Sequence, residues 1–486
     1  MPRPFHFRDN NKPGIASACG LVLEVVVSNN RRLRRAPHGS DKELLDLEPE
    51  NIIRWQADCV AIPFRFEVFV NVWIGKRRWE ISDSGKNRSN DSDEPLSSRY
   101  IVTILLAMAN TPKDFDLLLY GATGTTGRSA AKFLKNNAPK DFRLAIAGRN
   151  RRKLEELELN LPVIVADTTD RAQMQAMVAR ARVLLNMAGP FHGEEILIEA
   201  CLETSTHYAD ISGETARIRR LINQYHDKAI QKQVKIINFG GVSSIPADVG
   251  AYLLDQSLGG RLVEAEAFLQ IEGGSLNGGT VASMAQEIES GDACLAKDPF
   301  LLGPSGRLPS KMEQTPKGIS WDSRLLMWTH RSPMETSDTK AVRRSFTLTG
   351  RSVIFQERQA HTRLRNALSM WLSLNLLGFA MSWKPTRALV KKMVPPGTGT
   401  NKERRRQGFL HILVRGRSSE GTQAQVSLQF SGDLSNTITV MTACQVALCL
   451  AADEEKLPKR FGVLTPTVGL GSSLIDRLIS SGVKIK

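Results

Sequence analysis

The sequence predicts an α/β protein, in which a doubly wound parallel sheet is followed by a second domain with a mixed sheet and α+β structure. Three observations lead to this prediction. From residue 114 to about residue 250, short apolar runs alternate with amphipathic segments, as they do where helices connect parallel strands. A glycine-rich turn joins the first apolar run to the first amphipathic segment. From about residue 251 to residue 460, alternating strand-like segments and long connections replace that pattern.

Length, charge and cysteine content exclude several classes. The 486 residues suffice for two or three domains, and 41% of them are hydrophobic, as in globular proteins. A net charge of +15 suits nucleic acid, but the chain has neither zinc-finger spacing nor basic strands with interleaved aromatic residues. We therefore expect no nucleic-acid partner, but an anionic cofactor, an anionic substrate or a membrane surface. The 6 cysteines include no CxxC pair, and no secretory leader is evident, which predicts free thiols, no metal centre and a cytoplasmic protein.

Residues 1–107 show no sustained helical or strand period. Two apolar stretches, Leu21–Val27 and Val60–Trp73, leave a small accessory domain open. We favour a disordered extension or an over-extended gene model, with Met108 as the natural start, because Met108 leads directly into the first strand of the parallel sheet.

The opening βαβ unit predicts a dinucleotide site. Strand Phe115–Tyr120, helix Arg128–Asn137 and strand Phe142–Ala147 flank a turn with three glycines. In such a Rossmann turn one glycine allows the tight bend, one lets the backbone approach the pyrophosphate, and one lets the helix pack closely on the sheet. The unpaired amides of the first helical turn point at the anion. The expected contacts are Gly121, Ala122, Thr123, Gly124, Thr125, Thr126 and Gly127.

The end of the second strand predicts NADPH as the cofactor. Arg149 and Asn150 stand where NAD-binding proteins carry a carboxylate for the ribose 2′-hydroxyl, and the first acid is Glu155. A guanidinium there can bind a 2′-phosphate through two charge-assisted hydrogen bonds. Arg149 is the expected principal contact. Whether Arg151 and Arg152 assist stays open, because both also suit a solvated helix start.

Later strand ends supply further cofactor contacts. The next strand, Val163–Ala166, ends at Asp167, which we expect near the adenine. Strand Val183–Met187 ends in a segment that leaves bare backbone at the ligand-binding edge of the sheet. That segment contains Ala188, Gly189 and Pro190. The helices Arg152–Leu159, Arg171–Arg180, Gly193–Glu203 and Ala216–Gln233, and a strand Val234–Phe239, complete the expected domain over residues 114–250.

Reduction by a nicotinamide nucleotide also requires a proton source. No tyrosine has a lysine four residues later, so the Tyr-xxx-Lys mechanism of short-chain dehydrogenases is excluded. Near the predicted cofactor edge, Tyr208 is the first candidate, because a phenol can donate a proton. His192 is the second, because imidazole titrates near neutrality. Ser212 and Glu214 are the remaining candidates, and each of the four also suits a structural role.

The second domain, residues 251–460, is expected to contain a strand at Val263–Ile271 that pairs antiparallel, a hairpin of Phe409–Arg415 with Ala424–Phe430, and a closing helix, Ile438–Ala452. Residues 296–345 are expected to be loop-rich. Within this domain, Ala367–Trp383 is the most apolar stretch, and arginines and lysines flank it. It is short for a membrane span. Two interpretations stay open: peripheral membrane contact through residues 367–392, or a helix covering the substrate site or a homodimer interface.

Several motifs in one order carry a family resemblance. They include YGATGTTGR, LAIAGRNRRKL, LLNMAGPF, ACLETSTHYADISGE, VSSIPADVGA and GVLTPTVGLGSSLIDRL. Together they resemble the saccharopine dehydrogenase-like oxidoreductases, and within these the trans-acting enoyl reductases. The resemblance implies an NAD(P)-binding Rossmann domain, a mixed α+β second domain and a C-terminal segment, residues 461–486, that returns to the first domain. The chain departs from the family at Phe191, where a tyrosine is usual, and at Ser243, where an acid is usual.

The expected function is therefore NADPH-dependent reduction of an enoyl thioester or another conjugated C=C bond, in lipid or secondary-metabolite synthesis. The substrate would be a small molecule or an acyl thioester, free or bound to a carrier protein. The alternative is a catalytically weak NADPH-binding scaffold or sensor at a membrane or lipid-droplet surface, which the missing acid at Ser243 favours.

Overall fold

The computed structural model describes residues 113–189, 195–273, 278–303, 314–395, 398 and 407–486, and the backbone of four strands between residues 18 and 82. The chain divides into two units, Met1–Pro112 and Lys113–Lys486. The first unit contains one antiparallel sheet in the order β1-β2-β3-β4, and it includes most of the Val60–Trp73 stretch. Its strands are β1 (Ala18–Val26), β2 (Ile52–Ile62), β3 (Arg65–Ile74) and β4 (Arg77–Ser82). That residues 1–107 lie outside the native protein stays a prediction.

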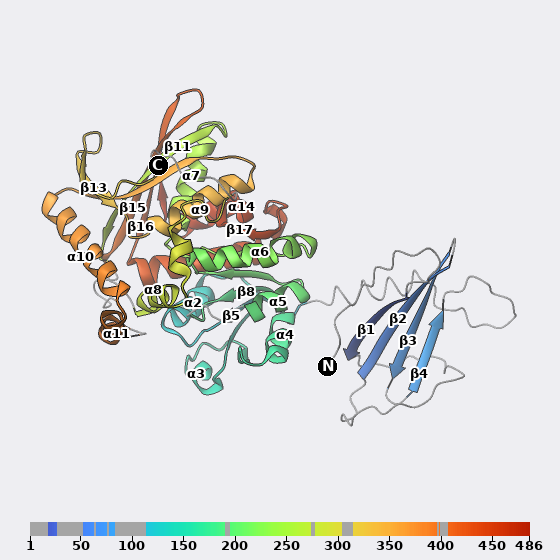
Figure 1. The fold of residues 1–486 in the computed structure, drawn as a ribbon. Helices are drawn as coiled ribbons and strands as arrows, with labels where there is room; N and C mark the ends of the chain where they lie inside the picture. The colour runs from blue at the N-terminus through green and yellow to red at the C-terminus, as the bar shows by residue number, and fades with distance from the viewer. Residues whose placement is uncertain are drawn as a thin grey trace. The chain divides into compact units, whose positions relative to one another are not determined.

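The second unit opens with the parallel sheet that the sequence predicted (Figure 1). Its seven strands run in the order β17-β10-β9-β8-β5-β6-β7, and all neighbours are parallel. The first six in chain order have the 3-2-1-4-5-6 arrangement of a Rossmann fold, so the order reverses between β5 and β8. The strands are β5 (Phe115–Tyr120), β6 (Leu144–Gly148), β7 (Val163–Val165), β8 (Ala181–Asn186), β9 (His207–Asp210), β10 (Lys235–Ile237) and β17 (Gly462–Leu464).

Helices cover both faces of this sheet, because alternate residues of each strand point to opposite sides. Leu117 and Leu119 of β5 pack in one core with α2 (Thr125–Asn137) and α13 (Thr439–Ala452). Leu118 lies in the other core, with α4 (Arg171–Ala179), α5 (Glu195–Glu203) and α6 (Thr215–Gln231). The short α3 (Arg151–Glu155) connects β6 to β7.

A second seven-stranded sheet has the order β12-β13-β14-β11-β15-β16-β18. Its central strand β11 pairs antiparallel with β15, as expected, but parallel with β14 on its other side. β15 and β16 form the expected hairpin. The helices α7 (Ile245–Ser257) and α8 (Gly278–Glu289) precede and follow β11. The strands are β11 (Leu262–Glu272), β12 (Ser320–Asp322), β13 (Met327–Arg331), β14 (Ile354–His361), β15 (Phe409–Ser418), β16 (Gln423–Ser431) and β18 (Lys484–Ile485).

The expectation of a loop-rich segment over residues 296–345 is wrong in its last part, where α9 (Glu335–Leu348) forms. The reason is that α9 buries charged side chains, so its inward face lacks the apolar period by which an amphipathic helix is recognised. The buried charged residues are Glu335, Asp338, Lys340, Arg343 and Arg344. Arg343, for example, donates to the carbonyls of Pro299 and Phe355 from within the core.

The C-terminal segment contributes to both sheets, because β17 joins the parallel sheet and β18 pairs with β16. Between them lie α14 (Pro466–Leu470) and α15 (Ser472–Ser480). The hydrophobic stretch of the second domain forms α10 (Leu364–Ser382), followed by α11 (Lys384–Met393). Within the described residues, one helical stretch has the length and apolar composition of a membrane span. That stretch is Leu434–Ala452, of which 83% is buried in the protein.

Candidate functional site

The predicted dinucleotide turn leaves β5 at the point where the strand order reverses. Gly121 has φ +82°, and a Cβ there would lie 2.6 Å from the amide nitrogen of Ala188. A Cβ on Gly127 would lie 2.1 Å from the carbonyl oxygen of Gly121. Both positions therefore require glycine, the first for its backbone conformation and for the neighbouring loop, the second for close contact of α2 with the turn. Ala122 is fully buried beneath this turn.

The start of α2 is open to solvent. Gly124 is its N-cap and offers no side chain to the free amides of the first helical turn, and both Gly124 and Thr125 are exposed. Thr123 and Thr126 are half-buried, and the Nε of Arg128 donates to the carbonyl of Thr123 at 3.0 Å. This arrangement of close-packed glycines below an uncapped helix start matches what a pyrophosphate needs.

Arg149 is the exposed guanidinium beside this turn. In the described part of the chain it has no carboxylate partner within ion-pairing distance, whereas Arg151 pairs with Glu155 at 3.5 Å and Arg152 with Glu156 at 3.0 Å. Arg151 and Arg152 thus each pair with a carboxylate at α3, and whether they also assist the cofactor stays open. Asn150 accepts the amide of Lys153 at 3.0 Å and so serves as the N-cap of α3.

Asp167 follows β7 and lies close enough to Arg149 for each to influence the other. Two hydrogen bonds from Thr169, from its amide at 3.0 Å and its hydroxyl at 2.9 Å, are the main reason why the pKa of Asp167 is lowered, and the charge of Arg149 adds to the effect. This places Asp167 on the same side of the turn as Arg149, where the adenosine end of a dinucleotide would lie.

The loop after β8 closes the other side of the turn. The Oδ1 of Asn186 accepts the amide of Ala188 at 3.0 Å, and the amide of Met187 donates to the carbonyl of Tyr120 at 2.9 Å. Ala188 and Gly189 thus lie beside Gly121, at the switch point of the sheet. Pro190 and His192 lie outside the described residues, and their assignments stay predictions.

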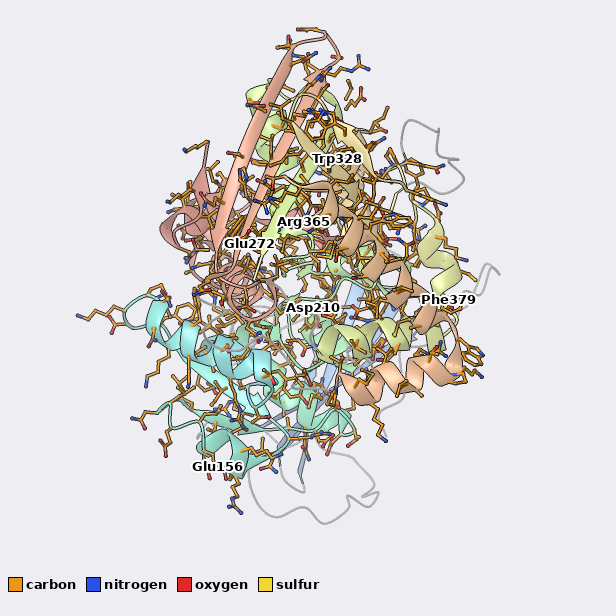
Figure 2. The ribbon with its side chains drawn as sticks, turned by 90° about the vertical axis from the view of Figure 1, so that its left-hand side faces the viewer. Glu156, Asp210, Glu272, Trp328, Arg365 and Phe379 are labelled. Atoms are coloured by element: carbon orange, nitrogen blue, oxygen red, sulfur yellow. The ribbon has the colours of Figure 1, made fainter. Side chains whose placement is uncertain are left out.

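A buried polar network holds the carboxyl ends of β8, β9 and β10 together. The hydroxyl of Tyr208 accepts a hydrogen bond from Nδ2 of Asn186 at 3.0 Å and donates one to Oδ2 of Asp210 at 2.9 Å. The other carboxylate oxygen, Oδ1, accepts the amide and the hydroxyl of Ser212, at 3.0 and 2.7 Å. Asn238 donates to Oδ2 of Asp210 at 3.0 Å, and Arg217 lies 3.7 Å from that oxygen. Figure 2 shows Asp210 within the body of the molecule, whereas Glu156, the C-cap of α3, lies at its edge.

This network contains two of the sequence-based catalytic candidates, Tyr208 and Ser212, whose catalytic roles stay predictions. Tyr208 is 0% and Ser212 1% exposed, so neither can touch a substrate in this conformation. Burial raises the pKa of Asp210, and the positive charge of Arg217 and the hydrogen bonds from Ser212 and Asn238 oppose that rise. Tyr208 and Ser212 therefore act on Asp210 and on the loop after β8. The signal available in the sequence was that Asn186, Asp210 and Asn238 are polar residues at the ends of three successive strands.

The second domain meets the parallel sheet at Gly213. A Cβ there would lie 3.5 Å from the hydroxyl of Ser243 and 3.7 Å from the Cβ of Ser337 at the start of α9. Gly213, Ser243 and Ser337 are half-buried, as is Glu214, which accepts the amide of Gly213 at 3.0 Å. Next to them, Ser244 has φ +139°, and its buried hydroxyl has no hydrogen-bond partner among the described residues. Gly213, Glu214, Ser243 and Ser337 are partly accessible at this edge, whereas Ser244 and Tyr208 are buried.

Comparisons with known proteins agree with this geometry. Residues 117–237 match the family described as the saccharopine dehydrogenase NADP binding domain. A Mycobacterium tuberculosis protein assigned as a trans-acting enoyl reductase, Rv2449c, is 31% identical over 414 residues, which span 78% of this chain and 99% of that relative. The chain belongs to the trans-acting enoyl reductase family. It is an NAD(P)H-dependent oxidoreductase with a saccharopine dehydrogenase-like NADP-binding domain, and its cofactor is NADPH.

Further similarities lie at lower identity. A trans-acting enoyl reductase of Mycobacterium bovis strain BCG is 27% identical over 419 residues, which span 77% of this chain and 98% of that protein. The solved structure of apo saccharopine dehydrogenase (L-Glu forming) from Saccharomyces cerevisiae covers 76% of this chain and 99% of its own, with a TM-score of 0.42 and 12% identity.

Proposed function

We propose that this trans-acting enoyl reductase relative reduces the conjugated C=C bond of an acyl thioester that a carrier protein presents, as one step of lipid or secondary-metabolite synthesis. The observation that carries the proposal is the open nucleotide turn with the unpaired Arg149 beside it, in a chain aligned along almost the full length of a protein assigned as a trans-acting enoyl reductase. Reduction of an enoyl group requires a hydride donor, which NADPH can be, and the described turn fits the pyrophosphate of NADPH.

In this proposal the chain's own residues bind and orient, while NADPH, when bound, supplies the hydride. The first-turn amides of α2 would hold the pyrophosphate, and Arg149 would hold the 2′-phosphate. Asn186, fixed by Tyr208, holds Ala188 against the turn, and this loop would support the nicotinamide half. Positioning of this kind is the protein's main contribution in a cofactor enzyme.

We place the substrate's C=C bond at the half-buried edge around Gly213, because the partly accessible side chains of Glu214, Ser243 and Ser337 lie beside that glycine. Hydride addition to the β-carbon leaves negative charge on the thioester, and a proton must then reach the α-carbon. Any of these three side chains, or water beside them, can deliver it. If Glu214 delivers the proton to the α-carbon, the acid that the family usually has at position 243 is not needed for this protonation.

The test follows NADPH absorbance with the full-length protein and a panel of enoyl thioesters, each offered as a free thioester and as the same acyl group on an acyl carrier protein. The proposal expects oxidation of NADPH that depends on the C=C bond, with a higher kcat/KM for the carrier-bound form. The matched saturated thioesters are the control and should give no oxidation. NADPH binding without oxidation on every substrate would contradict the proposal and favour the scaffold function; equal rates with free and carrier-bound substrates would contradict only the carrier.

A further inference from the structure

An exposed apolar stripe runs along α10. Six large side chains of this helix and its C-cap are between 44% and 73% exposed, with Phe379 the most exposed of them. At about 100° per residue they fall within an arc of about 120° on a helical projection, so they form one continuous face. We call Leu364, Leu368, Leu372, Leu376, Phe379 and Trp383 the α10 face. Figure 1 shows α10 and α11 at the outer side of the unit, and Figure 2 places Phe379 at its periphery.

Three polar side chains of α10 donate hydrogen bonds to carbonyls of the same helix. The Nδ2 of Asn375 donates to the carbonyl of Trp371 at 2.7 Å, and the hydroxyl of Ser382 donates to that of Phe379 at 2.7 Å. The hydroxyl of Ser373 donates to the carbonyl of Ser369 at 2.8 Å. Such bonds back to the preceding turn are how a helix keeps polar side chains in surroundings that offer no water. Each of these three side chains thus has a donor that is already paired when the α10 face is covered.

Charge is distributed in a way that fits an anionic surface. The eighteen residues from Asn366 to Trp383 include no charged side chain, and the whole segment from Arg363 to Pro395 has no Asp or Glu. Exposed basic residues stand at both ends of the stripe: Arg363 and Arg365 at its start, and Lys384 and Lys392 beyond its end. In α11, Leu389 and Met393 continue the apolar surface, with 56% and 71% exposure.

The helix is held flat against the protein. Ala367 and Met381 are buried, and the Nε1 of Trp371 donates to the carbonyl of Lys317 at 3.2 Å. The corner between α10 and α11 is fixed by the buried Arg387, which donates to the carbonyl of Met381 at 2.8 Å and pairs with Glu289 at 3.2 Å. A helix attached in this way along its length presents one side to a surface and cannot cross a bilayer.

We propose that the α10 face binds the interface of an anionic phospholipid membrane, with the apolar stripe among the acyl chains and Arg363, Arg365, Lys384 and Lys392 at the headgroups. A second copy of the chain fits less well, because two such faces would bring like charges together with no acid to balance them. The inference is independent of the proposed reductase activity, since membrane binding needs no substrate.

The test uses the full-length protein in flotation assays with phosphatidylcholine vesicles, with and without phosphatidylserine. The wild type should float with the anionic vesicles, and less with the neutral ones or at high salt. The double variant Leu372→Asp and Phe379→Asp should bind roughly tenfold or more weakly. Ile479→Asp, on the exposed surface of α15 at 51%, is the matched control and should bind as the wild type does.

Two further measurements make the outcome decisive. All variants should retain NADPH binding, which shows that they are folded, because the altered side chains are exposed. Lys384→Gln with Lys392→Gln should reduce the preference for anionic vesicles. Failure of the wild type to float with either vesicle, or equal flotation of the double variant, would overturn the proposal. A wild-type dimer in sedimentation analysis that the double variant abolishes would show that a second copy covers the α10 face instead.

Discussion

The hydroxyl of Tyr208 donates to Oδ2 of Asp210 at 2.9 Å, and neither residue has any exposed surface. Because Asn186 donates to the same hydroxyl, this one side chain connects the ends of β8 and β9. Asn186 in turn holds Ala188 beside the nucleotide turn. Two hydrogen bonds, from Asn186 to Tyr208 and from Ala188 to Asn186, thus connect Tyr208 to the loop after β8. We therefore interpret Tyr208 as a positioning residue.

Replacing Tyr208 by phenylalanine should therefore affect stability more than chemistry. The variant removes one hydrogen bond from each of the buried residues Asp210 and Asn186, which should lower the free energy of unfolding by about 1–3 kcal/mol. Turnover should fall far less than the roughly 10²- to 10⁴-fold expected for loss of a general acid. Urea unfolding and NADPH oxidation measure the two effects. A stable variant with a thousandfold lower turnover would restore Tyr208 as the proton donor.

Alanine at Gly127 should abolish NADPH binding. Its Cβ would lie 2.1 Å from the carbonyl oxygen of Gly121, so α2 or the turn must shift, and the amides that hold the pyrophosphate shift with it. Gly378→Ala is the matched control, because that helical glycine has nothing within 4 Å of an added Cβ. The control should bind NADPH normally and gain up to about 1 kcal/mol of stability. Fluorescence titration and thermal unfolding decide; normal binding by Gly127→Ala would contradict the assigned turn.

Arg149→Gln should weaken NADPH binding about 10- to 100-fold and leave NADH binding nearly unchanged, because only NADPH has a 2′-phosphate for the guanidinium to bind. Arg152→Gln serves as the control, since Arg152 is already paired with Glu156 at 3.0 Å and should change neither affinity. Calorimetric titration of both nucleotides is the measurement. Equal losses for NADPH and NADH in the Arg149 variant would exclude the 2′-phosphate role.

Asp248 should make the protein less stable as pH rises. Burial raises its pKa to about 6, although Ser345 and Thr467 donate hydrogen bonds to it. Since the folded state then binds a proton more tightly than the unfolded state, stability is highest below the unfolded pKa and declines until the pH passes about 6. Relative to Asp248→Asn, the wild type should lose about 2 kcal/mol between about pH 4.5 and 7. If the difference in free energy of unfolding between the wild type and Asp248→Asn stayed constant across this pH range, the raised pKa of Asp248 would be refuted.

The nucleotide half of the site was predictable because its determinants are local. Gly121, Gly124 and Gly127 lie within seven residues between a strand and a helix, and the backbone geometry of that turn follows from their order. The same holds for Arg149, which lies directly after β6. The proposed substrate half was not predictable in this way. Ser337 reaches Gly213 across more than a hundred residues, and α9 was not recognised because its inward face is charged.

Sequence by itself determined the class of fold, the turn that binds the cofactor and the preference for NADPH, since each follows from hydrophobic period, glycine spacing or the residue type at a strand end. Only the tertiary structure decided which polar residues are buried and which are accessible. It placed Tyr208 and Ser212 inside a hydrogen-bond network and left Glu214, Ser243 and Ser337 at the edge. The physical reason is that burial depends on which distant segments pack against a side chain, and neighbours in sequence do not specify them.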